Sequence, residues 1–94
     1  MPKAADRHKS VSPEIAFGRI LRALRKSRSL SQDELAAQSG YHRTYIGFLE
    51  RGQKSPSLRT IFDLSATLNV SPSRLIRNTE RFARFSSPVK ANRR

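Results

Sequence analysis

Residues 30–52, LSQDELAAQSGYHRTYIGFLERG, contain the local signals that decide the fold of this chain. Ser31 and Glu34 have the spacing of a capping box, in which each side chain accepts a hydrogen bond from the other residue's backbone amide and so starts a helix. Gly40 can adopt the positive φ that ends a helix, which places the first helix of this stretch before it. A second helix is expected from about His42 to Gly52.

The two helices would be joined by about three residues, which is the layout of a helix-turn-helix motif. The apolar positions agree, because side chains three and four residues apart share one face of a helix. The side chains expected to point inward are Leu35, Ala36, Ile46 and Leu49. Ala36 must be small because the second helix crosses close above it. In such a motif the second helix lies in the major groove of DNA.

The sequence on either side predicts three more helices and no strand. Ser-Pro pairs at 12–13 and 71–72 each supply an N-cap hydroxyl followed by proline at the first helical position. The additional helices are expected from Pro13 to about 27–29, from Ser57 to about 68, and from Ser71 to about Arg77. In the helix that begins at Ser57, the side chains expected to point inward are Leu58, Ile61, Leu64 and Leu68. Asn69 follows this helix and is suited to the left-handed backbone conformation that ends it. The fold class is therefore all-α.

The chain of 94 residues has room for one compact domain. Residues 1–12 are expected to form a flexible basic arm, residues 13–77 the helix-turn-helix domain, and residues 78–94 a basic C-terminal segment that dimerises in part and is then disordered.

Positive charge is the main compositional feature, with 19 Lys and Arg against 7 Asp and Glu and a net charge of +12. The excess is present in the helical region as well as in both terminal segments. Such a field attracts polyanions, of which nucleic acid is the commonest. An anionic membrane surface, or a basic surface that serves solubility alone, is the alternative.

The inventory of reactive side chains argues against an enzyme. The chain has no cysteine, its two histidines have no metal-ligand spacing, and its four glycines are isolated rather than grouped in a phosphate-binding loop. We therefore expect no catalytic residue, no metal and no cofactor. No apolar run is long enough to span a bilayer, so we expect no transmembrane segment, no membrane partner and a cytoplasmic location.

Three stretches together resemble the Cro/C1-type helix-turn-helix family, also called the XRE family. They are LSQDELAAQSG (30–40), YHRTYIGFLERG (41–52) and SPSLRTIFDLSATLNVSPSRL (55–75). The resemblance implies a compact five-helix, lambda-repressor-like domain that binds palindromic double-stranded DNA as a dimer. Ser29 and Asn69 stand where the family often has glycine.

The outward face of the second motif helix is expected to contact bases. Its members are Arg43, Thr44, Tyr45, Gly47 and Phe48. Arg43 can donate two hydrogen bonds to guanine, and Phe48 can pack on thymine methyl groups. Alternatively, Phe48 packs against the next helix or a loop, and Tyr45 contacts a base or a phosphate or only fills space.

Side chains around the motif are expected to contact phosphates. They are Gln32, His42, Arg51, Lys54, Ser55 and Ser57. For Gln32 the favourable position is a helix N-terminus, where free amides attract anions. The resemblance further implies a structural ion pair between Arg25 and Glu50, whose burial the sequence leaves open.

Apolar residues near the C-terminus are expected to form a dimer interface, unless the two phenylalanines fold back on their own domain. They are Leu75, Ile76, Phe82 and Phe85. The function expected is a sequence-specific regulator, a repressor, that binds a palindromic operator as a homodimer. An antitoxin that represses its own operon and a restriction-modification controller are the alternatives, and a further protein partner, a toxin or polymerase, stays open. A protein-interaction module that no longer reads DNA is the competing class.

Overall fold

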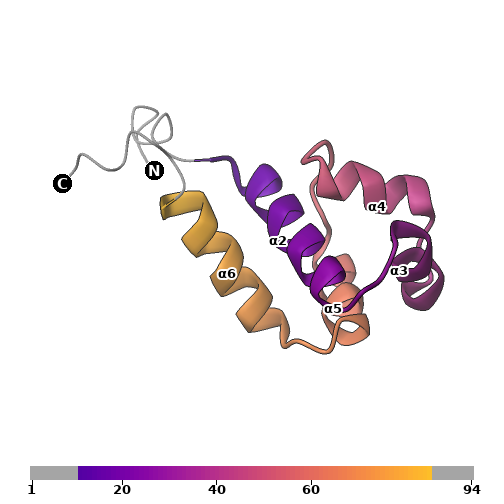
Figure 1. Cartoon of the computed structure of the whole chain (residues 1–94). Coiled ribbons are helices and arrows are strands. Elements are labelled where there is room, and N and C mark those ends of the chain that lie inside the picture. The colour runs from indigo at the N-terminus through magenta and orange to yellow at the C-terminus, as the bar shows by residue number, and fades with distance from the viewer. Residues whose placement is uncertain (1–10, 86–94) are drawn as a thin grey trace.

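The computed structural model describes residues 11–85, in which five helices follow one another and no strand occurs (Figure 1). The helices are α2 (Pro13–Ser27), α3 (Gln32–Ser39), α4 (Arg43–Glu50), α5 (Leu58–Thr67) and α6 (Pro72–Phe85). The all-α prediction is confirmed. Most of the predicted arm and the end of the chain lie outside the described residues.

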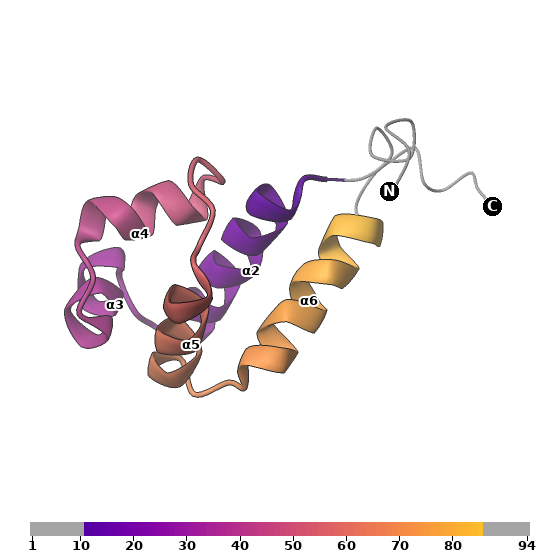
Figure 2. The same cartoon turned by 180° about the vertical axis from the view of Figure 1, so that it is seen from behind.

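The helices pack around α2, which lies between α6 on one side and α4 on the other (Figures 1 and 2). Both views place α3 and α4 at the opposite end of the molecule from α6. Helix α5 packs against both α3 and α6 and so closes the core between the two ends. The motif helices are therefore supported from behind by α2 and α5. No helix among residues 11–85 is long and apolar enough to cross a bilayer.

Local signals fix most helix ends where the sequence predicted them. The hydroxyls of Ser12, Ser31 and Ser57 each accept a hydrogen bond from the backbone amide three residues later. The capping box is complete, because the amide of Ser31 also donates to Glu34 over 2.8 Å. Gly40 has φ 82° and Asn69 has φ 57°, so both take the left-handed conformation expected of them.

The core is a cluster of apolar side chains drawn from all five helices: Phe17, Leu21, Leu35, Ala36, Ile46, Leu49, Leu64, Leu68 and Leu75. The inward positions predicted for the two motif helices are confirmed. The prediction for Leu58 is wrong, since 72% of this residue is exposed. Leu58 is the first residue of α5, and it lies at the edge of the row of apolar side chains in which Leu64 and Leu68 are buried.

The last helix is longer than the sequence predicted, because α6 continues past Arg77 to Phe85. No glycine or proline interrupts the chain there, and contacts with α2 support the added turns. The amide of Val11, just before α2, donates to the carbonyl of Ala83 over 3.1 Å. The boundary expected at Arg77 therefore falls inside a helix.

Candidate nucleic-acid interface

Helices α3 and α4 form the motif, joined by Gly40, Tyr41 and His42. The amides of Gly40 and Tyr41 both donate to the carbonyl of Ala36, over 2.9 and 3.1 Å, and so close the end of α3. His42 is the N-cap of α4, because its Nδ1 atom accepts from the amide of Thr44. The first turn of α4 is thus set by a side chain that was expected to contact phosphate.

The turn is anchored to α5 through Tyr41, whose hydroxyl donates to Asp63 over 2.7 Å. The nearby Thr60 hydroxyl lowers the pKa of Tyr41, but the hydrogen bond to Asp63, burial and the Asp63 charge together raise it above the usual tyrosine value. This hydrogen bond joins the turn between α3 and α4 to α5, and so holds the motif against the rest of the domain.

The C-terminal end of α4 is held by the ion pair between Arg25 and Glu50. The Nε and Nη2 atoms of Arg25 donate to the two carboxylate oxygens of Glu50 over 2.6 and 3.0 Å, and Nη1 donates to the carbonyl of Leu30 over 2.7 Å. Both charged side chains are more than nine-tenths buried. The pair that the resemblance implied is therefore present, bidentate and shielded from water.

Gln32 joins this pair and makes it a three-residue network. Its Nε2 atom donates to Glu50 over 3.0 Å, so the first residue of α3 is tied to the last residue of α4. The hydrogen bond to Glu50 and its charge, only partly opposed by burial, raise the pKa of Arg25 above the usual arginine value. Gln32 was expected to contact phosphate, and one N–H of its amide now has an internal partner.

Gly18 permits this close packing of α2 on α4. A Cβ atom at this position would collide with the carbonyl oxygen of Leu49 and would lie 2.6 Å from that of Glu50. Sequence reasoning missed Gly18, because no turn or motif marks it. Only a glycine in the middle of a helix, where it lowers helix propensity, hints at a backbone approach.

The five residues expected to contact bases differ in exposure: two are exposed, and the other three are half-buried or buried. Arg43 and Thr44 are exposed on the first turn of α4, as a reading face requires. Phe48 is half-buried, and the cations of Arg51 and Lys54 lie 5.4 and 5.7 Å from its ring centroid. This aromatic ring therefore lies beside two of the predicted phosphate-binding side chains.

Tyr45 and Gly47 do not lie as expected. The Tyr45 hydroxyl is 3.2 Å from that of Thr60 on α5, and its ring is tilted against Tyr41 at a centroid distance of 5.4 Å. Gly47 is buried, because the guanidinium of Arg51 covers the place where a Cβ atom would be. Of the alternatives for Tyr45, the one in which the side chain fills space describes this arrangement, because its hydroxyl turns toward the neighbouring helix.

The loop after α4 carries the remaining predicted phosphate contacts. Arg51, Lys54 and Ser55 are exposed, and Nε of Arg51 donates to Gln53 over 2.9 Å. Ser57 is committed to capping α5, since its hydroxyl accepts from the amide of Thr60. A hydroxyl engaged in this way is less available to a phosphate than those of its neighbours.

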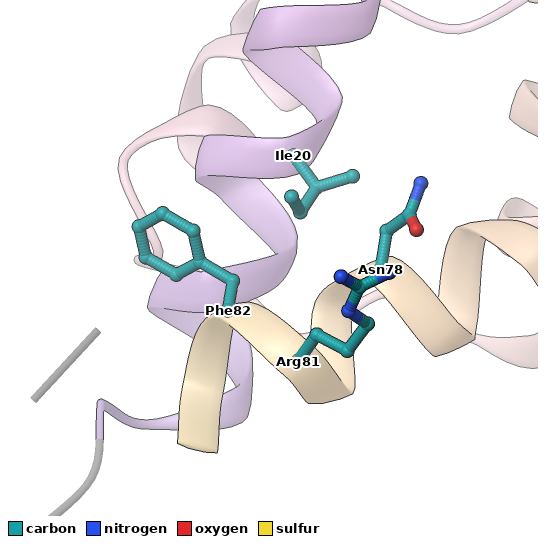
Figure 3. Close-up of a pocket in the computed structure, with 4 residues that line it drawn as sticks. All are labelled: Ile20, Asn78, Arg81 and Phe82. Carbon is teal, nitrogen blue, oxygen red and sulfur yellow. The ribbon is translucent and has the colours of Figure 1, made fainter. Parts of the chain in front are cut away.

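The residues expected at a dimer interface are not one surface. Leu75 is wholly buried in the core, so its side chain is not available to a partner, whereas 45% of Ile76 is exposed. Phe82 is half-buried and lines a shallow hollow between α2 and α6 with Ile20, Asn78 and Arg81 (Figure 3). The side chain of Phe85 lies outside what the structure describes. The fold-back alternative thus describes Phe82 better.

The helix-turn-helix family model matches residues 21–75, which include the turn, the whole of α4 and every residue of the core cluster except Phe17. The chain belongs to this helix-turn-helix family. Control protein C.BamHI of Bacillus amyloliquefaciens is 41% identical over 63 residues, which cover 66% of this chain and 78% of that protein.

Two solved structures of helix-turn-helix regulators agree with the observed fold. The restriction-modification controller protein C.AhdI from Aeromonas hydrophila is 44% identical with a TM-score of 0.63, and the match covers 65% of this chain and 92% of that one. SinR, a master regulator of biofilm formation solved in complex with DNA, is 31% identical with a TM-score of 0.61, and the match covers 64% and 97% of the two chains.

Proposed function

We propose that this protein is a transcriptional regulator that binds a palindromic operator in double-stranded DNA as a homodimer and acts as a repressor without catalytic activity. The observation that carries the proposal is the first turn of α4. There Arg43 and Thr44 are exposed, while the buried pair of Arg25 and Glu50 holds the far end of the same helix.

A rigid helix of this kind suits the major groove. Its N-terminal side chains would meet base edges, with Arg43 on the O6 and N7 atoms of a guanine and Thr44 on a base edge or a thymine methyl. Arg51 and Lys54 would contact phosphates on the flank, which fixes the register of the helix without reading sequence. The similarity to SinR, which was solved in complex with DNA, supports DNA as the partner of this fold.

Dimerisation is supported by an exposed apolar patch on α5 and α6. Leu58, Phe62 and Ile76 are 72, 53 and 45% exposed, and they share one hollow with Arg77 and Glu80. We assign this patch to a second copy of the chain, because it holds Arg77 and Glu80, whose opposite charges can pair across a two-fold axis. A palindromic operator would require the α4 helices of the two copies to lie about 34 Å apart, one turn of DNA.

Control of a restriction-modification system is the second candidate within the same class. It is favoured by the similarity to C.BamHI and C.AhdI, both named as controller proteins. The discriminating observation is genomic: genes for a DNA methyltransferase and an endonuclease should lie beside this one. Their absence from the neighbourhood would leave the general regulator as the proposal.

Selection of bound duplexes from a random pool tests the proposed function. The expected result is a palindromic consensus that binds far more tightly than unrelated duplexes and loses affinity steeply as salt rises. Equal binding to every duplex would refute sequence-specific regulation. Repression is tested separately, by placing the selected site at a promoter.

Light scattering tests the dimer. The wild-type chain should have twice the monomer mass, and Phe62→Glu should reduce it to that of a monomer by burying an unpaired charge at the contact. Ala23→Glu, at an exposed position of α2 outside the patch, is the matched control and should leave the mass unchanged. A wild-type monomer at high concentration, with and without DNA, would refute the dimer.

A further inference from the structure

Asp33 lies in the first turn of α3 and faces Arg43, the first residue of α4. The Nε atom of Arg43 is 3.0 Å from Oδ1 of Asp33, and the two side chains are 64 and 74% exposed. An ion pair this exposed contributes little to stability. The pair matters instead for DNA binding, because Arg43 is the residue expected to contact guanine.

Asp33 is the acidic side chain of α3 that the helix start does not use. Glu34 is committed to the capping box, where it accepts from the amide of Ser31. Asp33 accepts no backbone hydrogen bond among those that close the start of α3, and its carboxylate is instead directed at the neighbouring helix. The residue therefore acts between the two motif helices.

The part of the Arg43 guanidinium that contacts Asp33 determines which N–H donors remain available to DNA. A guanidinium carries one N–H donor on Nε and two on each Nη atom. The Asp33 carboxylate lies against the Nε side of the guanidinium as an ion pair, so the Nη1 and Nη2 donors are farther from it. A pair of donors suits the O6 and N7 atoms of guanine. The same contact restricts a long side chain that would otherwise lose its rotamer freedom on binding.

We propose that Asp33 is a positioning residue that makes Arg43 specific for guanine. It holds Nε so that the Nη donors meet a base, and its negative charge offsets the attraction of Arg43 for any nearby phosphate. The residue thereby lowers affinity for duplexes in general and preserves affinity for the operator. This inference rests on the proposed DNA-binding function.

The test repeats the random-pool selection with the full chain and the variants Asp33→Asn, Arg43→Ala and the double variant. Asp33→Asn should reduce the preference for guanine about tenfold at the one base pair where Arg43→Ala also removes it. Its binding to unrelated duplexes should rise severalfold. In the Arg43→Ala background, Asp33→Asn should leave the base preferences unchanged, because its effect passes through the arginine.

Glu14→Gln is the matched control. Glu14 lies in the first turn of α2, outside both the motif and the apolar patch, so the variant removes the same charge from a part of the domain that neither contact uses. It should leave every base preference unchanged. A guanine preference that survives Asp33→Asn, or a loss spread evenly over all positions, would overturn the role of Asp33 alone. A wild-type chain with no preference at all would overturn the proposed function and this inference together.

Discussion

Replacement of Glu50 by alanine is expected to be the most destabilising change at the DNA-facing side of the domain. The variant would leave the guanidinium of Arg25 buried with its Nε and Nη2 donors unpaired, after the loss of hydrogen bonds of 2.6 and 3.0 Å. It would also release Gln32, which donates to the same carboxylate. One substitution would thus loosen α2, α3 and α4 from one another.

The magnitude follows from the burial of the pair. Removing one partner of a buried ion pair costs about 3–5 kcal/mol, because the other charge stays in a poorly solvated place. For a domain of this size each kcal/mol lowers the Tm by about 4–8 °C, so the expected decrease is about 12–40 °C. The total stability of a small domain is about 5–15 kcal/mol, so a fraction of the molecules would be unfolded.

Urea denaturation followed by circular dichroism is the assay, with four variants. Glu50→Ala and Arg25→Ala should each cost several kcal/mol, whereas the joint change Arg25→Met with Glu50→Leu should cost much less, since no charge is left buried. Arg84→Ala, which removes the other member of the exposed pair with Glu80 and lies outside the apolar patch, should cost less than about 1 kcal/mol. Salt up to 1 M should alter the effect of Glu50→Ala little, because buried pairs are weakly screened.

Two results would refute this reasoning. If Glu50→Ala cost no more than Arg84→Ala, the network would not hold the motif together. If the joint apolar replacement were as unstable as the single variants, packing rather than an uncompensated charge would explain the loss. Glu50→Gln, which keeps the shape and the acceptor for Gln32, keeps the test informative where the alanine variant does not fold.

Four further predictions concern other contacts of the same domain. Gly18→Ala should destabilise the fold by about 1–3 kcal/mol by forcing α2 away from the Leu49 and Glu50 carbonyls, as overpacking does. Gly47→Ala should raise the Tm slightly through helix propensity, because its Cβ meets only the mobile end of Arg51 at 3.0 Å; thermal denaturation of both variants checks the contrast. Lys54→Ala should weaken binding to all duplexes alike and reduce the slope of log affinity against log salt by about 1, measured by fluorescence anisotropy. The raised pKa of Tyr41 means that the folded state holds this proton more tightly, so its contribution is present below about pH 10 and is lost as pH rises through the folded pKa. The free energy of unfolding should therefore fall less steeply above pH 10 in Tyr41→Phe than in the wild type, and a constant difference between the two would contradict this assignment.

The helix starts could be predicted because their signals lie within three or four residues. A serine accepts from the amide three positions later, and this is readable at Ser12, Ser31 and Ser57 without knowledge of the fold. The end of α6 has no such signal at Arg77. Its last turns depend on packing against α2 and on a hydrogen bond from Val11, which are contacts between distant parts of the chain.

The candidate site was predictable only in part, for the same reason. Helical spacing located the buried row through Ile46 and Leu49, and the family resemblance supplied the pair of Arg25 and Glu50. Spacing could not show that Tyr45 turns toward Thr60, or that Gly18 faces a carbonyl about thirty residues away. Both features depend on how helices cross, which no single helix encodes.

The polar contacts that the sequence did not predict share a physical property. The partners of Gln32, Tyr41 and Asp33 lie on other helices, and an exposed or half-exposed contact of this kind contributes only about 0–1.5 kcal/mol. Apolar periodicity, in contrast, marks residues whose burial dominates stability. Substitution of Asp33 should therefore weaken the preference for guanine at one base pair while leaving the fold intact, because an ion pair this exposed contributes little to the stability that the core supplies.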